Sequence, residues 1–395
     1  DMLAKGKLFP MMQEMQKRKR TWQHQTQIDL VEGTKDADII VSGPLLITES
    51  YCIAEKRQVP WIPVIYGAVF PTSEYPNPFV TESNWFGWLN RLSYDFLYFA
   101  LWQHEKTDIN KFRAEQLELG PMKGYRGVMT AIEEKNLLSI GAFHQCAIPS
   151  QKRPKDWPES IFFSNFFFVP PSPESAVSNQ LKAFFAEAEE GSATIYMGLG
   201  SMPAPDPQAL LDIAQDVVEK LEGVRALVCA GWSDLLPDGQ DKRESGDGGS
   251  GGKKLVWRNE TTRSKILVVR SVPHDYIFPK CKVIVHHAGA GTAAAALRSG
   301  VPSVCIPVML DQPFNARHLQ KLGAAPAAVP FKDAIVAPSR VLSAVSEALH
   351  SDQMKTCAGA LASQISEAPE GTRAAVERIL ETYPEAAAGG REQAA

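Results

Sequence analysis

The sequence contains 395 residues, of which 44% are hydrophobic and 22% are charged, and its formal net charge at pH 7 is −4. This length and apolar content predict two globular domains, each with its own core. The nearly balanced charge excludes a protein that binds nucleic acid through a broad basic field, because such binding depends on neutralising phosphates. No apolar run reaches the roughly 18 residues that a membrane-spanning helix needs.

The cysteines are scattered along the chain and show no CxxC spacing, which is typical of reduced thiols in an intracellular protein. There are six of them: Cys52, Cys146, Cys229, Cys281, Cys305 and Cys357. The predicted location is therefore the cytoplasm or the surface of a membrane. The chain begins with Asp1 and not with Met, which suggests that it starts partway into a longer or processed protein.

The first part of the chain has the pattern of a β-α-β unit. A helix is expected at residues 10–33, and ADIIVSG (37–43) has the β-branched content of a buried parallel strand. A helix at 48–57 and a strand at 61–69 complete the unit. The aromatic segment that follows (84–105) repeats large apolar residues at a helical spacing. These are Trp88, Leu92, Phe96 and Phe99. Packing in the core is the favoured interpretation, and a pocket for an apolar ligand or contact with a membrane surface is the alternative.

The second part of the chain alternates strands with helices, the pattern of a doubly wound α/β domain. Strands are expected at 192–201, 225–232, 265–272, 282–289 and 301–308, and helices at 207–222, 292–299 and 312–323. A proline-rich connection around one aromatic strand precedes this part. We therefore expect an N-terminal domain at 1–170, a second domain at 171–360, and a C-terminal helix and tail at 361–395. The glycine-rich segment 244–254 is expected to be a surface loop without chemistry.

Ligands of an open parallel sheet bind outside the carboxyl ends of its strands, so the segments after the predicted strands are the candidates for chemistry. GLGSM (198–202) closes the first strand of the second part. Its glycines let the backbone approach a ligand, and Ser201 can bond a phosphate oxygen. Taken alone this motif is weak, since glycine-serine turns after strands are common.

The segment VHHAGAGT (285–292) joins a predicted strand to a predicted helix through small residues. The first N–H groups and the dipole of such a helix attract an anion, and His287 can add a charge-assisted hydrogen bond to phosphate. A metal site is the alternative, but adjacent histidines on a strand point to opposite faces, and no third ligand lies at a zinc spacing. The segment therefore predicts an anion site without a metal. His286 is expected to face the other side of the strand from His287 and to have a structural role.

Asp311 and Gln312 follow the next predicted strand in PVMLDQPFNA (307–316). A carboxylate beside an amide provides acceptors and donors that suit neighbouring sugar hydroxyls. A simple helix N-cap by Asp311 is the alternative and would be favoured if the motif stood alone. The motif does not stand alone, because it follows the predicted anion site by one strand.

The second part of the chain strongly resembles the donor-binding half of family 1 glycosyltransferases of the GT-B fold, most of all the sterol 3-beta-glucosyltransferase branch. The resemblance rests on five motifs in this order: GLGSM, AGW, SVPHDYIFP, HHAGAGT and GVPSVCIPVMLDQPFNA. The resemblance spans about residues 190–325, and the segment from ADIIVSG to PNPF is similar more loosely. It implies an α/β protein of two Rossmann-like domains, the N-terminal one incomplete. It also implies a UDP-sugar, most readily UDP-glucose, as the donor, with no metal and no further cofactor.

Roles carried over by position concern the donor. The resemblance implies diphosphate contacts for Ser201 and His287, and backbone or hydroxyl contacts for Gly289, Ala290, Gly291 and Thr292. It further implies uracil recognition by the backbone of Val272, with Trp232 near the base, and sugar contacts for Asp311 and Gln312. Two departures are Ala288, where the family usually has glycine and the change is expected to be mild, and Ser271, where plant members stack a tryptophan on uracil.

The family's first strand and glycine-rich loop, which carry the base for the acceptor hydroxyl, have no counterpart in residues 1–36. His104, Asp95 and His144 are available, and none of them is predicted to be this base. The resemblance implies an inverting transfer of a hexose to a lipophilic acceptor such as a sterol, with contact to a membrane surface as an option. The alternatives are a non-catalytic subunit of an assembly, whose partner chain covers the incomplete domain, and a segment of a complete enzyme.

Overall fold

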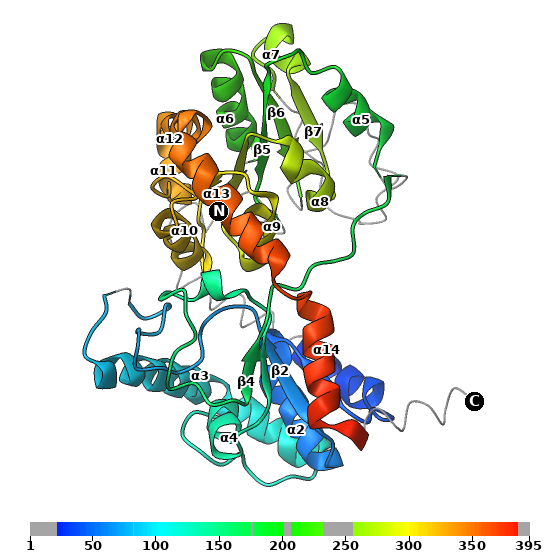
Figure 1. Ribbon diagram of the computed structural model, residues 1–395. Helices are drawn as coiled ribbons and strands as arrows, with labels where there is room; N and C mark the ends of the chain where they lie inside the picture. The colour runs from blue at the N-terminus through cyan, green and yellow to red at the C-terminus, as the bar shows by residue number, and fades with distance from the viewer. Residues whose placement is uncertain (1–21, 82, 175–176, 201–206, 232–255, 386–395) are drawn as a thin grey trace. The chain divides into compact units, whose positions relative to one another are not determined.

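The structure is a computed structural model that describes residues 22–81, 83–174, 177–200, 207–231 and 256–385. It divides into two compact units (Figure 1). The N-terminal unit comprises the described residues up to 168 together with those from 368 onward, and the C-terminal unit comprises those from 169 to 367. In the described ranges, none of the helices has both the length and the apolar character that a membrane span requires.

The N-terminal unit is built on a parallel sheet of four strands in the order β1-β2-β3-β4. The strands are β1 (Ile40–Ser42), β2 (Trp61–Ile65), β3 (Ser139–Gly141) and β4 (Ile161–Phe163). The helices are one that reaches residue 33, then α2 (Ile47–Arg57), α3 (Gly87–Gln116), α4 (Val128–Glu134) and α14 (Gly371–Thr382), with short turns η1 (Pro44–Leu46) and η2 (Gln145–Ala147). The first two strands are shorter than the sequence indicates, and β3 has only three residues, too few for a periodic signal.

Side chains of β2 alternate between the two faces of this sheet, as the pleat of a strand requires. Trp61 packs with residues of α2, α3 and α4 on one face. Ile62 and Val64 pack on the opposite face with Ala375 and Ile379 of α14. The last helix of the chain therefore belongs to the core of the N-terminal unit, and Figure 1 shows α14 alongside this sheet. Nothing in its own sequence indicates which unit it joins.

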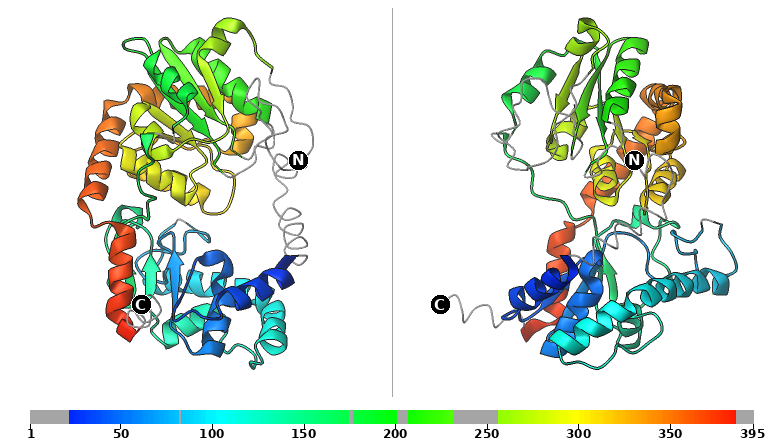
Figure 2. Two further views of the ribbon diagram at one scale, coloured as in Figure 1. Left: turned by 90° about the vertical axis from the view of Figure 1, so that its right-hand side faces the viewer. Right: turned by 180° about the vertical axis from the view of Figure 1, so that it is seen from behind.

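Helix α3 exposes the aromatic residues that the sequence places in a core. Trp88 is 68% exposed and Phe96 is 64% exposed. The buried face carries Tyr94, Tyr98 and Trp102 instead, so the favoured interpretation from the sequence is wrong for the first half of this helix. Figure 1 and the right-hand view of Figure 2 show this half extending beyond the sheet of its unit.

The charged residues of the same half of α3 turn toward the protein. Asp95 accepts a hydrogen bond of 2.9 Å from the buried Arg126, which also binds Glu133 at 2.6 Å. Arg91 binds the other oxygen of Glu133 at 2.9 Å. The first half of α3 therefore exposes Trp88 and Phe96 to solvent, while Arg91 and Asp95 form ion pairs with neighbouring residues.

The C-terminal unit contains a parallel sheet of five strands in the order β7-β6-β5-β8-β9. The strands are β5 (Ala193–Gly198), β6 (Val224–Cys229), β7 (Ile266–Val269), β8 (Val283–His286) and β9 (Ser303–Cys305). The helices are α5 (Asn179–Ala186), α6 (Pro207–Lys220), α7 (Glu260–Ser264), α8 (His274–Ile277), η5 (Phe278–Lys280), α9 (Ala290–Ser299), α10 (Gln312–Lys321), α11 (Phe331–Val336), α12 (Pro338–His350) and α13 (Asp352–Glu367).

Both faces of this sheet are covered. Ile195 and Met197 of β5 pack on the face that α6, α11 and α12 cover. Tyr196 of the same strand packs on the other face, against residues of α5, α8 and α9. Helices on both faces of an all-parallel sheet define a doubly wound α/β fold, so the predicted fold class is confirmed.

Candidate functional site

The order of the strands in the C-terminal unit creates a switch point between β5 and β8. From β5 the chain first adds β6 and β7 on one side, and later adds β8 and β9 on the other. The connections that leave β5 and β8 therefore run to opposite faces of the sheet and part from each other at its carboxyl edge. In open α/β sheets this is where ligands bind.

Glycines allow very close approach of the loops at this edge. Gly200 follows β5 and has a φ of +62°, and a Cβ there would lie 2.6 Å from Cε1 of His287. Gly231 follows β6 with a φ of +58°, and a Cβ there would lie 2.3 Å from the carbonyl oxygen of Gly200. A Cβ on Gly289 would lie 2.4 Å from Nε2 of His287. The imidazole of His287 is thus enclosed by the backbone of two loops.

Helix α9 starts at this edge without a capping side chain. Its N-cap is Gly289, with extended backbone at φ −63° and ψ 147°, and no side chain there accepts an amide hydrogen. The amide groups of the first turn therefore remain for a ligand or water. Gly291 in this turn is exposed, whereas Thr292 is 8% exposed. The uncapped first turn and the Nε2 edge of His287 lie together, an arrangement that suits an anion.

The two adjacent histidines have different surroundings. The strand ends at His286, one residue before His287, so His287 belongs to the turn and not to the strand that the sequence indicates. His286 is fully buried, and its Nδ1 accepts a hydrogen bond of 3.1 Å from the amide of Ala288. His287 is 7% exposed. Nε2 of His286 and Nδ1 of His287 are buried without a hydrogen-bond partner among the described residues.

Burial keeps both imidazoles neutral at pH 7. Burial, together with His287 and His274 nearby, lowers the pKa of His286 to about 3. Burial and the neighbouring His274 lower the pKa of His287 to about 4. The charged imidazole that the sequence suggests for a phosphate contact is therefore not present in the ligand-free protein. An anion at the start of α9 would favour the protonated form of His287.

Solved glycosyltransferase structures share the fold of this chain. The glycotransferase of kitacinnamycin superposes on 90% of this chain and 79% of its own, with a TM-score of 0.63 and 16% sequence identity. The spinosyn rhamnosyltransferase SpnG complexed with thymidine diphosphate superposes on 96% of this chain and 84% of its own, with a TM-score of 0.53 and 16% identity. The chain has the GT-B fold.

Sequence similarity points to the same group of proteins. The family described as "Erythromycin biosynthesis protein CIII-like, C-terminal domain" matches residues 260–381. The sterol 3-beta-glucosyltransferase UGT80A2 of Arabidopsis thaliana is 27% identical over 352 residues, which are 89% of this chain and 49% of the relative. The sterol 3-beta-glucosyltransferase of Leptosphaeria maculans is 27% identical over 80% of this chain and 20% of its own length. The GT-B resemblance stated from the motifs is thus confirmed, and the chain spans half or less of these relatives.

Ala288 adopts a backbone conformation that favours glycine. Its φ is +63° and its side chain is fully buried. A residue with a Cβ pays a steric penalty of roughly 1–2 kcal/mol in this region. The change from glycine at this position, expected to be mild, therefore places a Cβ in the left-handed region of the backbone.

The side chains of Asp311 and Gln312 accept three hydrogen bonds within this segment. Oε1 of Gln312 accepts from the amides of Val308 at 2.8 Å and Met309 at 3.1 Å. Oδ2 of Asp311 accepts from Nδ2 of Asn315 at 2.8 Å. Asp311 occupies the N-cap position of α10, but its side chain caps no amide. Gln312 thus uses its oxygen to shape the loop, which leaves its NH₂ group as the part able to meet a ligand.

The other predicted donor contacts are placed as follows. Val272 comes three residues after β7 ends and packs, half-buried, against the core cluster that includes Ile277 and Phe278. Ser201 and Trp232 lie outside the described residues, as does the glycine-rich segment 244–254. Asn315 is a residue of the candidate site that the sequence motifs do not single out, although it stands four residues after Asp311 and so shares its helix face. In the part of the chain that the structure describes, no three His, Cys, Asp or Glu side chains gather to hold a metal ion.

The three side chains considered as bases lie in the N-terminal unit. His104 is exposed on α3, and Asp95 is bound to Arg126. His144 is buried, its Nδ1 accepts a hydrogen bond from the amide of Cys146, and burial lowers its pKa. Asp95 and His144 thus have structural partners, so the structure adds no support for either of them as a base.

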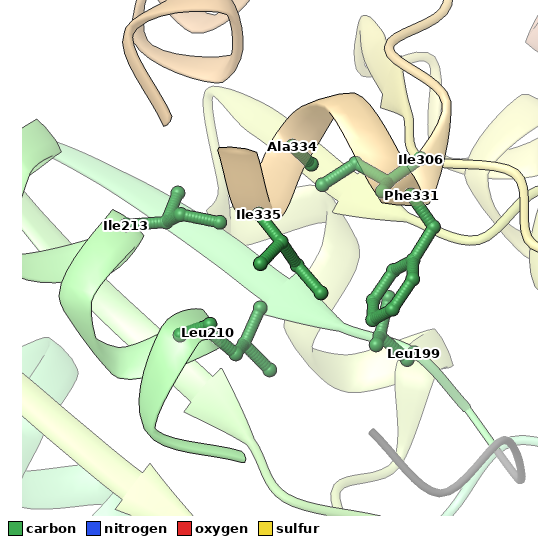
Figure 3. Close-up of a pocket in the computed structure, with 8 residues that line it drawn as sticks. Leu199, Leu210, Ile213, Ile306, Phe331, Ala334 and Ile335 are labelled. Atoms are coloured by element: carbon green, nitrogen blue, oxygen red, sulfur yellow. The ribbon is translucent and has the colours of Figure 1, made fainter. Parts of the chain in front are cut away.

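A cavity in the C-terminal unit of this GT-B fold is not the ligand site. Figure 3 shows it between Leu199, α6 and α11, where it is lined by Leu210, Ile213 and Ile335 among other apolar side chains. Its volume is about 10 Å³, at most the space of one water molecule. It is a packing defect behind the loop that follows β5, and it lacks polar groups to bind a nucleotide sugar.

Proposed function

We propose that this protein takes part in the transfer of a hexose, glucose by preference, from a UDP-sugar to the hydroxyl of a lipophilic acceptor such as a sterol, with inversion at the anomeric carbon. The observation that carries the proposal is the uncapped start of α9 beside the buried His287 at the switch point of the sheet. The motifs in the same unit and the names of the relatives support the choice of sugar and acceptor.

In the proposed reaction the oxygen of the acceptor hydroxyl attacks the anomeric carbon. A general base takes the hydroxyl proton, the bond between the anomeric carbon and the diphosphate oxygen breaks, and UDP leaves with that electron pair. Negative charge grows on the diphosphate as this bond breaks. The amides of the first turn of α9 and the ring of His287 would stabilise that charge in the transition state. No described residue is proposed as the base.

Donor binding tests the proposal first. UDP and UDP-glucose should each raise the melting temperature of the protein and give a measurable dissociation constant by calorimetry. Replacing His287 by alanine should weaken the binding of UDP and of UDP-glucose by roughly 10–100-fold, because hydrogen bonds to charged groups contribute about 1.5–3 kcal/mol. His350→Ala is the matched control, since His350 is exposed in the same unit. If neither ligand binds, or if His287→Ala changes nothing, the donor site is wrongly assigned.

The aromatic face of α3 supports a lipophilic acceptor, or contact with the membrane that contains it. We define the α3 stripe as Trp88, Leu92, Phe96 and Phe99, whose exposed fractions range from 44% to 68%. Four large apolar side chains on one exposed helix face mark a surface that meets an apolar phase or partner. The absence of a charged side chain at these four positions allows that contact without desolvating an ion.

The double variant Trp88→Gln/Phe96→Gln tests this surface. Stability should change by no more than about 0.5 kcal/mol, because exposed side chains contribute little, and UDP binding should be unaffected. Transfer of radiolabelled glucose to a sterol should fall at least about tenfold if the lost contact is worth about 1.4 kcal/mol. Leu101→Gln is the control, since Leu101 is 54% exposed on α3 outside the stripe. Equal transfer by the double variant and the wild type would contradict the assignment of the acceptor to this face.

A second candidate function is that of a non-catalytic subunit that keeps the donor site within an assembly. The edge of the N-terminal sheet favours it, because Val41 on the edge strand β1 is 49% exposed and Leu45 after it is 91% exposed. A partner chain that covers this edge would bury both side chains. UDP-glucose binding without transfer to any sterol, lipid or phenolic acceptor would support this function over the first.

A further inference from the structure

Asn315 connects the two turns of the candidate donor site. Its Nδ2 donates to the carbonyl oxygen of Ala288 at 2.9 Å and to Oδ2 of Asp311 at 2.8 Å. Both partners can only accept, so the nitrogen of the amide, and not its oxygen, must face them. Both hydrogens of the NH₂ group are used. The first partner belongs to the turn before α9, and the second precedes α10.

The first of these bonds holds a strained residue. Ala288 has a φ of +63°, a region that a residue with a Cβ rarely occupies. Its amide donates to Nδ1 of His286 at 3.1 Å, and its carbonyl oxygen accepts from Asn315. The two peptide groups that flank the unfavourable torsion are therefore each fixed by a side chain. Without the bond from Asn315, the turn could relax toward an extended backbone and move His287 and Gly289 away from the start of α9.

The second bond fixes the direction of a carboxylate. Asp311 is half-buried, and its Oδ2 is held by Asn315 one helical turn later. The backbone amide of Asn315 also donates a hydrogen bond of 2.9 Å to the carbonyl oxygen of Asp311. Oδ1 of Asp311 remains as the oxygen able to accept from a sugar hydroxyl.

We propose that Asn315 is a positioning residue that couples the diphosphate-binding turn at residues 287–289 to the sugar-binding carboxylate of Asp311. It touches neither the reacting atoms nor the donor. One amide group thereby sets the spacing between the two subsites, so that a nucleotide diphosphate and its attached hexose are recognised as one unit. The ligand part of this inference rests on the proposed function, and the structural part does not.

Affinities for UDP and for UDP-glucose separate the two effects of Asn315. Asn315→Ala should weaken UDP binding by roughly tenfold, because the turn loses its support, and should weaken UDP-glucose binding by a further several-fold, because Asp311 is no longer directed. Gln320→Ala is the matched control, since Gln320 is an exposed amide on the same helix. If transfer is observed, Asn315→Ala should raise KM for UDP-glucose more than it lowers kcat.

Ala288→Gly provides a rescue that a merely structural role would not predict. Glycine adopts a φ near +63° without strain, so the turn no longer depends on the bond from Asn315. In the Ala288→Gly background, Asn315→Ala should leave the affinity for UDP within about twofold of that of the Ala288→Gly variant, because the two substitutions act on the same turn and their effects are not additive. The extra loss for UDP-glucose should persist in this background, since glycine at position 288 does nothing for Asp311.

Thermal unfolding without ligand tests, independently of function, whether the bond from Asn315 supports the turn at Ala288. Asn315→Ala should lower the melting temperature by several degrees in the wild type and by less than half as much in the Ala288→Gly background. If the wild type binds neither UDP nor UDP-glucose, the proposed function fails. The melting temperatures of the four variants then decide alone whether Asn315 supports the turn. Equal shifts in both backgrounds would overturn the proposal. So would unchanged affinities in a folded Asn315→Ala variant.

Discussion

Replacing Gly231 by alanine is expected to lower the free energy of unfolding of the C-terminal unit by about 3 kcal/mol, because it combines an unfavourable torsion with a steric clash. Gly231 has a φ of +58°, and a Cβ on it would lie 2.3 Å from the carbonyl oxygen of Gly200. That oxygen belongs to a backbone that cannot retreat freely, because Gly200 itself packs against the ring of His287.

The matched control is Gly223→Ala. Gly223 has a similar φ of +67°, and a Cβ there would meet no atom within 4 Å. This variant isolates the cost of the torsion, which is about 1 kcal/mol. The difference between the two variants, measured by urea unfolding, reports the clash alone. Losses of equal size would show that the loops after β5 and β6 do not approach each other as closely as the structure has them.

The same substitution links packing to the candidate site. A Cβ on Gly231 pushes the loop of Gly200 toward His287, and therefore toward the start of α9. If UDP binds at this edge as proposed, Gly231→Ala should weaken UDP binding at temperatures where the variant is still folded, whereas Gly223→Ala should not. Calorimetric titration of both variants at 15 °C or another low temperature provides the measurement.

Elements with a strong local signal could be predicted from the sequence. The alternation of β-branched runs with amphipathic helices indicates the C-terminal sheet. The alanine-rich run indicates α9 with its correct end at Ser299, although the helix starts two residues before the expected position. The placement of the His287 turn and the loop of Gly200 at one edge of the sheet could be expected, because parallel strands bring their carboxyl ends to one edge. Their direct contact depends on the adjacency of β5 and β8, which the sequence does not indicate. These features depend on local periodicity and on a topology that few alternatives satisfy.

Features that depend on tertiary contacts could not be predicted. A helical repeat of Trp88 and Phe96 is the same whether it faces a core or the solvent. Its orientation is set by tertiary contacts, namely the ion pairs of Arg91 and Asp95 and the burial of the opposite face. The left-handed φ of Ala288 is hidden, because nothing in its own side chain requires it. The sequence places Asn315 on a helix but does not indicate its hydrogen bond to Ala288, since that partner lies before another helix.

Acidification is expected to destabilise the C-terminal unit well before its carboxylates are protonated. The pKa values of His286 and His287 in the folded protein are about 3 and about 4, below the ordinary value of 6.5. The unfolded chain therefore binds protons first as the pH falls. The contribution of the two histidines is complete above about pH 6.5 and declines as the pH falls toward their folded pKa values. Between pH 7 and pH 5 the expected loss is about 3–4 kcal/mol.

Other groups do not obscure this interval. Burial also lowers the pKa of His274, so it adds a loss of the same sign. The carboxyl groups with lowered pKa, such as Asp216 and Asp275, contribute stability that is lost only below about pH 4.5. Urea midpoints measured from pH 7 to pH 5 thus report mainly on the histidines.

The variant His286→Asn should remove about half of the pH dependence of stability that His286 and His287 contribute, because the pKa values of both histidines are lowered by similar amounts. The new Oδ1 can accept the amide hydrogen of Ala288 that Nδ1 of His286 now accepts, so the turn keeps its support. A pH dependence unchanged by this variant would show that His286 is protonated in the folded protein at these pH values, contrary to its complete burial.

Ligand affinity should respond to pH in the opposite direction. The two phosphates of UDP-glucose are diesters and do not titrate in this interval, so any change belongs to the protein. Under the proposed function a diphosphate at the start of α9 favours the protonated imidazole of His287, and binding takes up a proton. The affinity for UDP-glucose should therefore rise as the pH falls from 7 toward 5.5, while the free energy of unfolding falls. His287→Asn should abolish the pH dependence of affinity and His286→Asn should preserve it, because only His287 lies against the first turn of α9.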